Sequence, residues 1–202
     1  MKLFVPLLTP EKPIISYINK NYISINIKTV KPTKIGINSE VGQEIIKSIS
    51  KSNNNRIKKY NIIGIVEGDL DYTVELGKLE NNLTSYEIIK SIVPDFDAIE
   101  HIKLKTGKLC RGIDVFIKNY EKKNEEEEDF ISRIFLPLGA DEKYKEDPAC
   151  GSASSYIARY LIEKYPQYKG KNLKIYQASE DGALISVKNE NDEIIKVSGL
   201  VN

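Results

Sequence analysis

The sequence is poor in the features that mark secreted and membrane proteins. It has only two cysteines, Cys110 and Cys150, in 202 residues, too few for the disulfide framework of a small secreted domain. No apolar stretch approaches the roughly 18 residues that a membrane-spanning helix needs. The apolar start of the chain is interrupted by Pro6 and makes a poor signal peptide. We therefore expect a soluble, cytoplasmic protein in a reducing compartment, with no membrane partner.

The chain also lacks an excess of charge of either sign. Thirty basic and twenty-nine acidic residues leave a formal net charge of +1, so no overall field attracts a polyanion, and nucleic acid is not an expected partner. The composition does provide a core, because 41% of the residues are hydrophobic and 29% are charged, as in folded globular proteins. A chain of this length can form one ordinary domain or two small ones.

Periodic apolar residues predict strands interleaved with helices. Alternation predicts strands at 22–30, 61–66, 71–76, 113–117, 173–176, 183–187 and 194–197, and the last two flank a turn and so predict a hairpin. Helices are predicted after a cap at Asn38 or Ser39, at 85–92 before Pro94, and at 154–165 before Pro166. The charged segment 121–129 predicts an exposed loop, with a binding tail as the alternative. This mixture indicates an α/β or α+β fold.

The segment from Glu146 to Ser154, Glu-Asp-Pro-Ala-Cys-Gly-Ser-Ala-Ser, leads into the last predicted helix. The first N–H groups of a helix have no partner within it, and the helix dipole favours negative charge there, so this turn is a candidate anion site. Gly151 lets a ligand approach the backbone, and Ser152 adds a hydroxyl group. The alternative is structural: Asp147 caps the helix, and the small residues allow close packing.

Two pieces of sequence resemble the phenazine-biosynthesis-like (PhzF-like) isomerase family. They are an Arg-x-Phe-x-Pro stretch at 133–137 and Glu-Asp-Pro-x-x-Gly-Ser-Ala at 146–153, joined by a Pro-Asp-Phe stretch at 94–96 and by Gln177. The resemblance covers roughly residues 22–202 and implies an α+β, diaminopimelate epimerase-like lobe, in which a curved, mostly antiparallel sheet wraps round a central helix. It also implies a truncated first lobe: residues 1–37 would be its remnant and linker, and 38–202 the C-terminal lobe.

The resemblance gives roles to residues at the start of the last predicted helix. Asp147, Gly151, Ser152 and Ala153 correspond to substrate-binding positions, and Asp147 is the motif carboxylate placed for acid–base chemistry. Cys150 takes the place of a proton-transferring cysteine in related epimerases and racemases, and a helix N-terminus would lower the pKa of its thiol. The alternative is a small residue tolerated where the family often has threonine.

The function implied by the resemblance is that of an isomerase, which moves a proton between carbon atoms of a small amino- or carboxylate-bearing substrate without a cofactor or metal ion. Complete members carry a catalytic glutamate in a Ser-Glu-Thr-like segment, followed by a Gly-His-Pro element. The single histidine here, His101, lies between Glu100 and Ile102. Ser39-Glu40-Val41 resembles the glutamate segment but follows the strand at 22–30, so Glu40 is better explained as a helix-start residue.

The alternative function is that of a non-catalytic truncated relative, which acts as a binding or structural protein, or of a fragment from an incomplete gene model. In either case the expected ligand is a small carboxylate or amino acid. The face left open by the missing lobe would expose apolar groups, so we also expect self-association as a homodimer.

Overall fold

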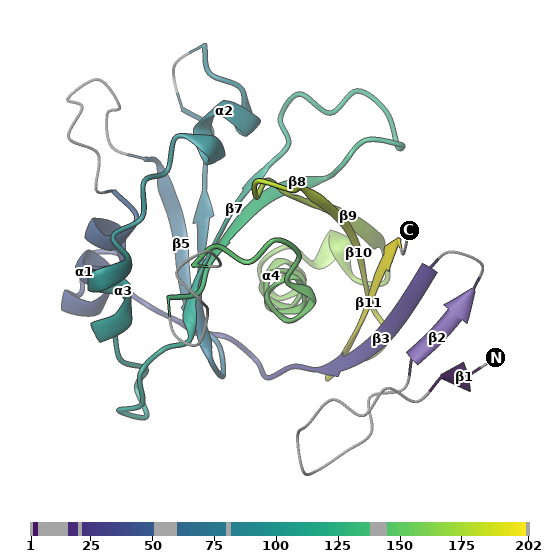
Figure 1. Cartoon of the computed structure of the whole chain (residues 1–202), viewed down its shortest axis with the longest axis horizontal. Coiled ribbons are helices and arrows are strands. Elements are labelled where there is room, and N and C mark those ends of the chain that lie inside the picture. The colour runs from purple at the N-terminus through teal and green to yellow at the C-terminus, as the bar shows by residue number, and fades with distance from the viewer. Residues whose placement is uncertain are drawn as a thin grey trace.

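An eleven-stranded sheet curves round the longest of the described helices (Figure 1). The computed structural model describes residues 2–3, 16–19, 22–50, 60–79, 82–137 and 145–200. Its strands are β1 (Lys2–Leu3), β2 (Ser16–Asn19), β3 (Tyr22–Lys28), β4 (Thr33–Lys34), β5 (Ile62–Glu67), β6 (Asp71–Leu76), β7 (Gly112–Lys118), β8 (Phe130–Phe135), β9 (Asn172–Gln177), β10 (Ala183–Asn189) and β11 (Ile194–Leu200). Its helices are α1 (Glu40–Ser48), α2 (Ser85–Lys90), α3 (Phe96–His101), α4 (Gly151–Lys164) and the 3-10 helix η2 (Pro166–Tyr168).

The sheet has the order β1-β2-β3-β11-β10-β9-β8-β7-β6-β5-β4. Eight of its ten strand pairings are antiparallel, and β6–β7 and β8–β9 are parallel. Figure 1 shows α4 end-on, with β3 and β7 to β11 around it. The predicted α+β class and the predicted curved sheet round a central helix are confirmed.

Helices cover both faces of the middle of the sheet. α1, α2 and α3 pack on one face, and α4 packs on the other (Figure 1). The strand β7 shows the division, because Val115 and Ile117 belong to the cluster with α1 to α3 whereas Phe116 belongs to the cluster with α4. A strand covered on both faces is buried at successive residues rather than at every second one, and β7 is buried from Gly112 to Ile117, including Asp114.

Local sequence signals set the ends of several elements as predicted. Ser39 caps α1, its Oγ accepting a hydrogen bond from the Gly42 N–H at 3.1 Å. Glu40 lies exposed in the first turn of that helix, as its helix-start interpretation requires. β10 and β11 form the predicted hairpin, and the segment 121–129 is an irregular connection between β7 and β8.

The strand predicted at 22–30 joins the sheet of the C-terminal strands. β3 pairs with β11 along all of its residues, from Tyr22 opposite Leu200 to Lys28 opposite Ile194. The proposed division of the chain at residue 37 stays a prediction, and residues 1, 4–15, 20 and 21 lie outside the described residues. Among the described helices, none combines the length and the apolar character needed to cross a membrane.

Candidate functional site

The N-terminus of α4 carries no side-chain cap. Its N-cap residue is Cys150, whose side chain makes no capping hydrogen bond. Asp147 does not cap the helix either: its Oδ1 accepts from the Ala149 N–H at 2.8 Å, in a turn that precedes the helix. The interpretation of Asp147 as a helix cap is therefore wrong. Within the described residues the backbone N–H groups of Gly151 and Ser152 have no hydrogen-bond acceptor, so the helix start keeps unpaired donors. We call residues 147 and 150–153 the helix-start site.

The two motif pieces of the sequence meet through an ion pair. Arg133 on β8 donates from Nε to Glu146 Oε1 at 2.7 Å and from Nη2 to Glu146 Oε2 at 2.6 Å. Its Nη1 also donates to the Ile92 carbonyl at 2.7 Å. The next residue, Asp147, donates its N–H to the Ile134 carbonyl at 3.0 Å. These contacts hold the segment 146–147 against β8 and so fix the approach to the helix-start site.

Gln177, at the end of β9, holds the other side of the same loop. Its side-chain oxygen accepts from the Cys150 N–H at 2.8 Å, and its Nε2 donates to the Asp147 carbonyl. The residue is fully buried, and both ends of its amide are used. Gln177 therefore links Asp147 and Cys150 rigidly, although the sequence singled it out only by resemblance.

Arg111 is a site residue that the sequence did not reveal. It lies just before β7, and its Nε donates to Asp71 Oδ1 at 2.9 Å while its Nη2 donates to Asp71 Oδ2. Its Nη1 donates to Ser152 Oγ at 3.0 Å. Because this Oγ accepts from Arg111, the hydroxyl hydrogen of Ser152 is directed elsewhere, either to a ligand or to Cys150 Sγ, 3.4 Å away.

Two buried carboxylic acids lie behind the helix-start site, and only one has a cation. Asp71 binds Arg111 in the bidentate pair, whose hydrogen bonds oppose the rise in the Asp71 pKa caused by burial. Asp114 accepts only a 3.4 Å hydrogen bond from Thr73 Oγ1, and its Oδ1 has no partner among the described residues. Burial, and then the charge of Asp71, raise the pKa of Asp114 well above its ordinary value. Asp114 is therefore the acid of this pair with the higher pKa.

Cys150 lies at the predicted place, but its predicted ionisation is wrong. The side chain is 6% exposed, and burial, followed by the charge of Asp114, raises the pKa of its thiol to about 12. The hydrogen bonds from Ser152 and from the Ala153 backbone lower it by less. The cost of removing a thiolate from water outweighs the helix N-terminus here.

Both cysteines are therefore expected to react slowly with iodoacetamide in the native protein. Burial also raises the pKa of Cys110 to about 12, so neither thiol forms much thiolate at neutral pH. We expect labelling of each at pH 7.5 to be about 100-fold or more slower than labelling of free cysteine. Mass spectrometry of timed samples measures the rates, with the urea-unfolded protein as the control. Rapid labelling of native Cys150 would contradict the burial argument.

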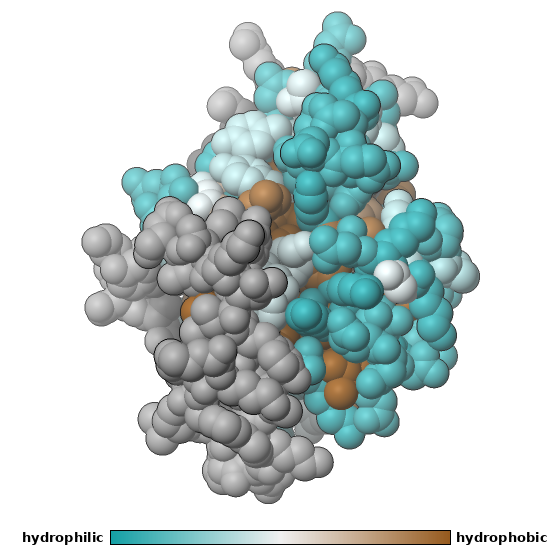
Figure 2. All heavy atoms as spheres, turned by 90° about the vertical axis from the view of Figure 1, so that its right-hand side faces the viewer, coloured by the Kyte–Doolittle hydropathy of each residue, from teal (hydrophilic) through white to brown (hydrophobic). Residues whose placement is uncertain are grey.

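An apolar hollow of about 470 Å³ opens beside the helix-start site. Ala149 and Gly151 form one side of it, and residues of β3, β10 and β11 form the rest. Figure 2 views the molecule from the side of β3 and β11, where apolar surface shows between hydrophilic parts. An apolar cavity beside a few polar donors is the usual form of a small-molecule site.

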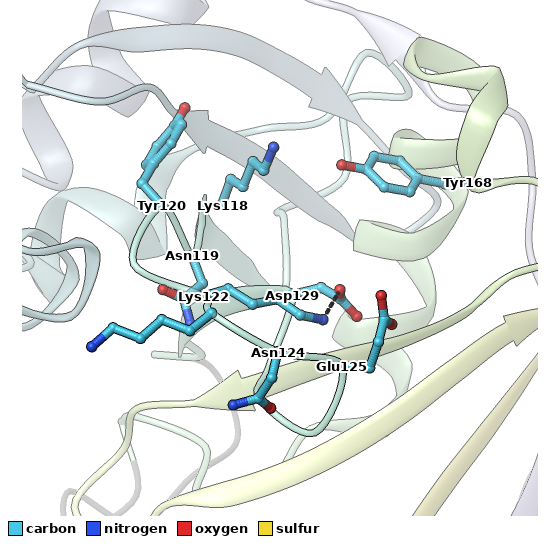
Figure 3. A pocket seen from close by; sticks show the side chains of 9 residues that line it. Lys118, Asn119, Tyr120, Lys122, Asn124, Glu125, Asp129 and Tyr168 are labelled. Atoms are coloured by element: carbon cyan, nitrogen blue, oxygen red, sulfur yellow. Dashed lines mark hydrogen bonds and ion pairs between the residues drawn. The ribbon is translucent and has the colours of Figure 1, made fainter.

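A second hollow, of about 380 Å³, lies at the opposite end of α4 (Figure 3). It is formed by the β7–β8 connection and by Tyr168, which follows the C-terminus of α4. The 14 residues of α4 place it about 20 Å from the helix-start site. Of the three lysines in its lining, Lys122 is paired with Asp129 at 2.6 Å, shown by the dashed line. Internal pairing of this kind stabilises the loop, so we do not assign the chemistry to this hollow.

No three His, Cys, Asp or Glu side chains of the described residues come together where they could hold a metal ion. The chemistry available at the helix-start site is that of backbone donors, one hydroxyl, one thiol and the carboxyl groups around them.

Structures with the same fold define the class of this protein. A phenazine biosynthesis protein of the PhzF family from Enterococcus faecalis has a TM-score of 0.65 and 22% identity over 93% of this chain and 57% of that chain. A PhzC/PhzF protein from Clostridium difficile gives 0.63 and 19% over the same shares. A predicted epimerase from Pseudomonas aeruginosa gives 0.57 and 15%, over 99% of this chain and 63% of that one. The chain thus has the diaminopimelate epimerase-like α+β fold, and it spans about three fifths of the length of these proteins.

The family follows from the sequence match. The phenazine biosynthesis-like protein (PhzC-PhzF) family matches residues 40–200, which is most of the chain. The protein belongs to this family. No curated protein matches the sequence.

Proposed function

We propose that the protein is an isomerase of the PhzF type that shifts a proton on a small amino- or carboxylate-bearing substrate bound at the helix-start site. The observation that carries the proposal is the uncapped N-terminus of α4, with unpaired donors at Gly151 and Ser152 next to an open hollow. Family membership supports the reaction class. The substrate, the cytoplasmic location and the homodimer stay predictions.

In this proposal the substrate carboxylate accepts hydrogen bonds from the N–H groups of Gly151 and Ser152 and from the Ser152 hydroxyl, whereas Ala153, whose N–H donates to Cys150 Sγ, only borders the site. The helix dipole favours the negative charge at this end. Arg111 positions the hydroxyl by donating to its oxygen, while its own charge is paired with Asp71. A carboxylate is therefore favoured over a neutral ligand of the same shape.

Asp147 is the proposed acid–base group. Its Oδ1 is held by the Ala149 N–H, which leaves Oδ2 to receive the ammonium group of a substrate or a migrating proton. One carbon loses a proton and another gains one, so the reaction needs no oxidant or reductant. Cys150, with its raised pKa, is protonated at neutral pH and would act only as a proton or hydrogen-bond donor, not as the base that starts the reaction.

Two substitutions test this site by chemical-shift titration. Gly151→Val should abolish carboxylate binding, because the methyl groups of the new valine extend into the hollow. The substitution should not disturb the fold, because a Cβ at position 151 lies at an ordinary contact distance of 3.5 Å from Val197 Cγ1. Asp147→Asn should retain carboxylate binding but lose the preference for leucine over 4-methylpentanoate, which lacks the amine. Affinity of the wild type should be on the order of millimolar. If neither variant changes binding, the segment is only a helix start.

Turnover can be followed without knowing the physiological substrate. An enzyme that removes a proton from carbon exchanges it with solvent, so incubation of small amino acids and carboxylates in D2O should replace a C–H signal in the proton NMR spectrum. Asp147→Asn should slow the exchange by about 100-fold or more. Binding at the helix-start site without exchange of any ligand would instead favour the non-catalytic binding protein.

A further inference from the structure

The apolar hollow is an extension of the sheet surface on which α4 packs. Residues directly opposite one another on neighbouring strands share a face of the sheet. Val197 of β11 lies opposite Ile25 of β3 and Val187 of β10, and it forms part of the core beneath α4. Two residues further along β11, Gly199 lies opposite Ile23 and Ile185. Ile23, Gly199 and Ile185 therefore form a second row across the three strands. This row continues the apolar face formed by the first row, Ile25, Val197 and Val187.

This second row lies beyond the start of α4 and is only partly covered. Val187 is fully buried, but Ile23 is 37% exposed, and both rows contribute to the lining of the hollow. Gly199 leaves its centre open, because a Cβ built there meets no atom within 4 Å. The hollow thus results from an apolar row that is buried at Ile185, which is 6% exposed, but open towards Ile23 and without a side chain at its centre.

The lining of the hollow contains no charged side chain among the described residues. Its serine, Ser198, has its hydroxyl hydrogen-bonded to that of Ser24 at 2.8 Å. The unpaired polar groups at its edge are the N–H donors at the helix start, next to Gly151. A ligand that satisfies both surfaces has a negative group at one end and an uncharged apolar body at the other.

We propose that the hollow binds the apolar body of the substrate, and hence that the substrate is a small amphipathic carboxylate with a branched aliphatic or ring-shaped body. This inference rests on the proposed function, because it places the carboxylate at the helix-start site. It narrows the substrate class from any small carboxylate to those with an apolar part that covers the row of Ile23, Gly199 and Ile185.

Three ligands separate the contributions: acetate, 4-methylpentanoate and the neutral 4-methylpentanamide. Each fully buried methylene strengthens binding about fourfold, and the open hollow buries only part of the four additional carbons. We therefore expect 4-methylpentanoate to bind about tenfold more tightly than acetate, and the amide to bind about tenfold more weakly than 4-methylpentanoate. Chemical-shift titration should move the amide signals of both Gly151 and Gly199.

Gly199→Val is the decisive variant, because it fills the hollow without meeting another atom at Cβ. It should weaken 4-methylpentanoate to within about twofold of acetate while leaving acetate unchanged. Ser186→Val places the same side chain on the opposite face of β10 and serves as the control, with affinities equal to those of the wild type. Circular dichroism checks that both variants are folded.

The outcomes distinguish this inference from the proposed function. If acetate binds at Gly151 but 4-methylpentanoate binds no better, or if Gly199→Val leaves its affinity unchanged, the apolar subsite is overturned and the helix-start site stands. If the neutral amide binds as tightly as the carboxylate, the negative charge contributes nothing at the helix start, and the proposed function fails while the apolar subsite stands. If no carboxylate moves the signals of Gly151 and Ser152, the proposed function itself fails.

Discussion

Replacement of Arg111 by alanine is expected to lower the free energy of unfolding by about 3–5 kcal/mol. Asp71 is fully buried, and its carboxylate receives two hydrogen bonds from Arg111, whose side chain is only 30% exposed. Removal of the guanidinium leaves Asp71 without a counter-charge in a site that water does not reach. Breaking a buried pair from one side is costly because the remaining charge is then desolvated without compensation. Urea unfolding at pH 7 measures the change.

The double variant Arg111→Met with Asp71→Leu tests this explanation. If the cost comes from the orphaned carboxylate, removing both charges should recover most of the lost stability. The surface pair of Lys169 and Asp192 is the control, since both side chains are mostly exposed, and Lys169→Ala should leave the unfolding midpoint unchanged. A double variant as unstable as Arg111→Ala alone would show that packing of the arginine side chain, not the pairing of charges, matters at this place.

The pair of Arg111 and Asp71 shows why part of the site could not be predicted from the sequence. The helix-start residues were found from the sequence because their chemistry is local: small residues after Asp-Pro at the start of a periodic helix. Arg111 and Asp71 are 40 residues apart, and they meet because β6 and β7 pair in parallel with Asp71 opposite Gly112. That register is set by the packing of the whole sheet. The only local signal was a polar residue at the start of each strand.

Burial is a second reason why some strands and some pKa values could not be predicted from the sequence. The strand β8 was not predicted as a strand, since it is covered on both faces and its residues do not alternate between apolar and polar. The hairpin of β10 and β11 was predicted because its two strand-like runs flank a turn-forming stretch at 189–192. The pKa of Cys150 was predicted in the wrong direction for a related reason, since the helix N-terminus is visible in the sequence but the burial of the thiol is not.

The helix α4 was predictable from the apolar period of its sequence. Buried residues of that helix include Ile157, Ala158 and Leu161, which are apolar residues at helical spacing within the predicted helix 154–165. A helix that is also buried at Ser154 and Ser155 has neighbours on more than one side, which is the consequence of a sheet that curves round it. The hollow at Gly199 could not be predicted, because a glycine in a strand does not reveal what lies above it.

Replacement of Asp114 by asparagine is expected to remove a pH dependence from the stability of the protein. Burial and the charge of Asp71 raise the pKa of Asp114 in the folded state, while in the unfolded chain it returns to about 3.9. Between these two pKa values the folded protein binds a proton that the unfolded chain has released. The free energy of unfolding therefore falls as pH rises, with a slope of up to about 1.4 kcal/mol per pH unit from this group. The stabilising contribution is complete below pH 3.9 and is lost as pH rises through the folded pKa.

Urea unfolding of the wild type and of Asp114→Asn from pH 5 to pH 9 measures the two slopes. The slope, rather than the difference at one pH, is the informative quantity, because asparagine also brings an amide whose hydrogen bonds differ from those of the acid. Thr73→Val gives a second test: the Thr73 hydroxyl donates to Asp114 Oδ2 at 3.4 Å and lowers its pKa. Without that hydrogen bond the folded pKa should rise further, and the decline in stability should extend to higher pH. Parallel curves for the wild type and Asp114→Asn would mean that Asp114 is ionised in the folded protein, and that Arg111 neutralises both acids rather than Asp71 alone.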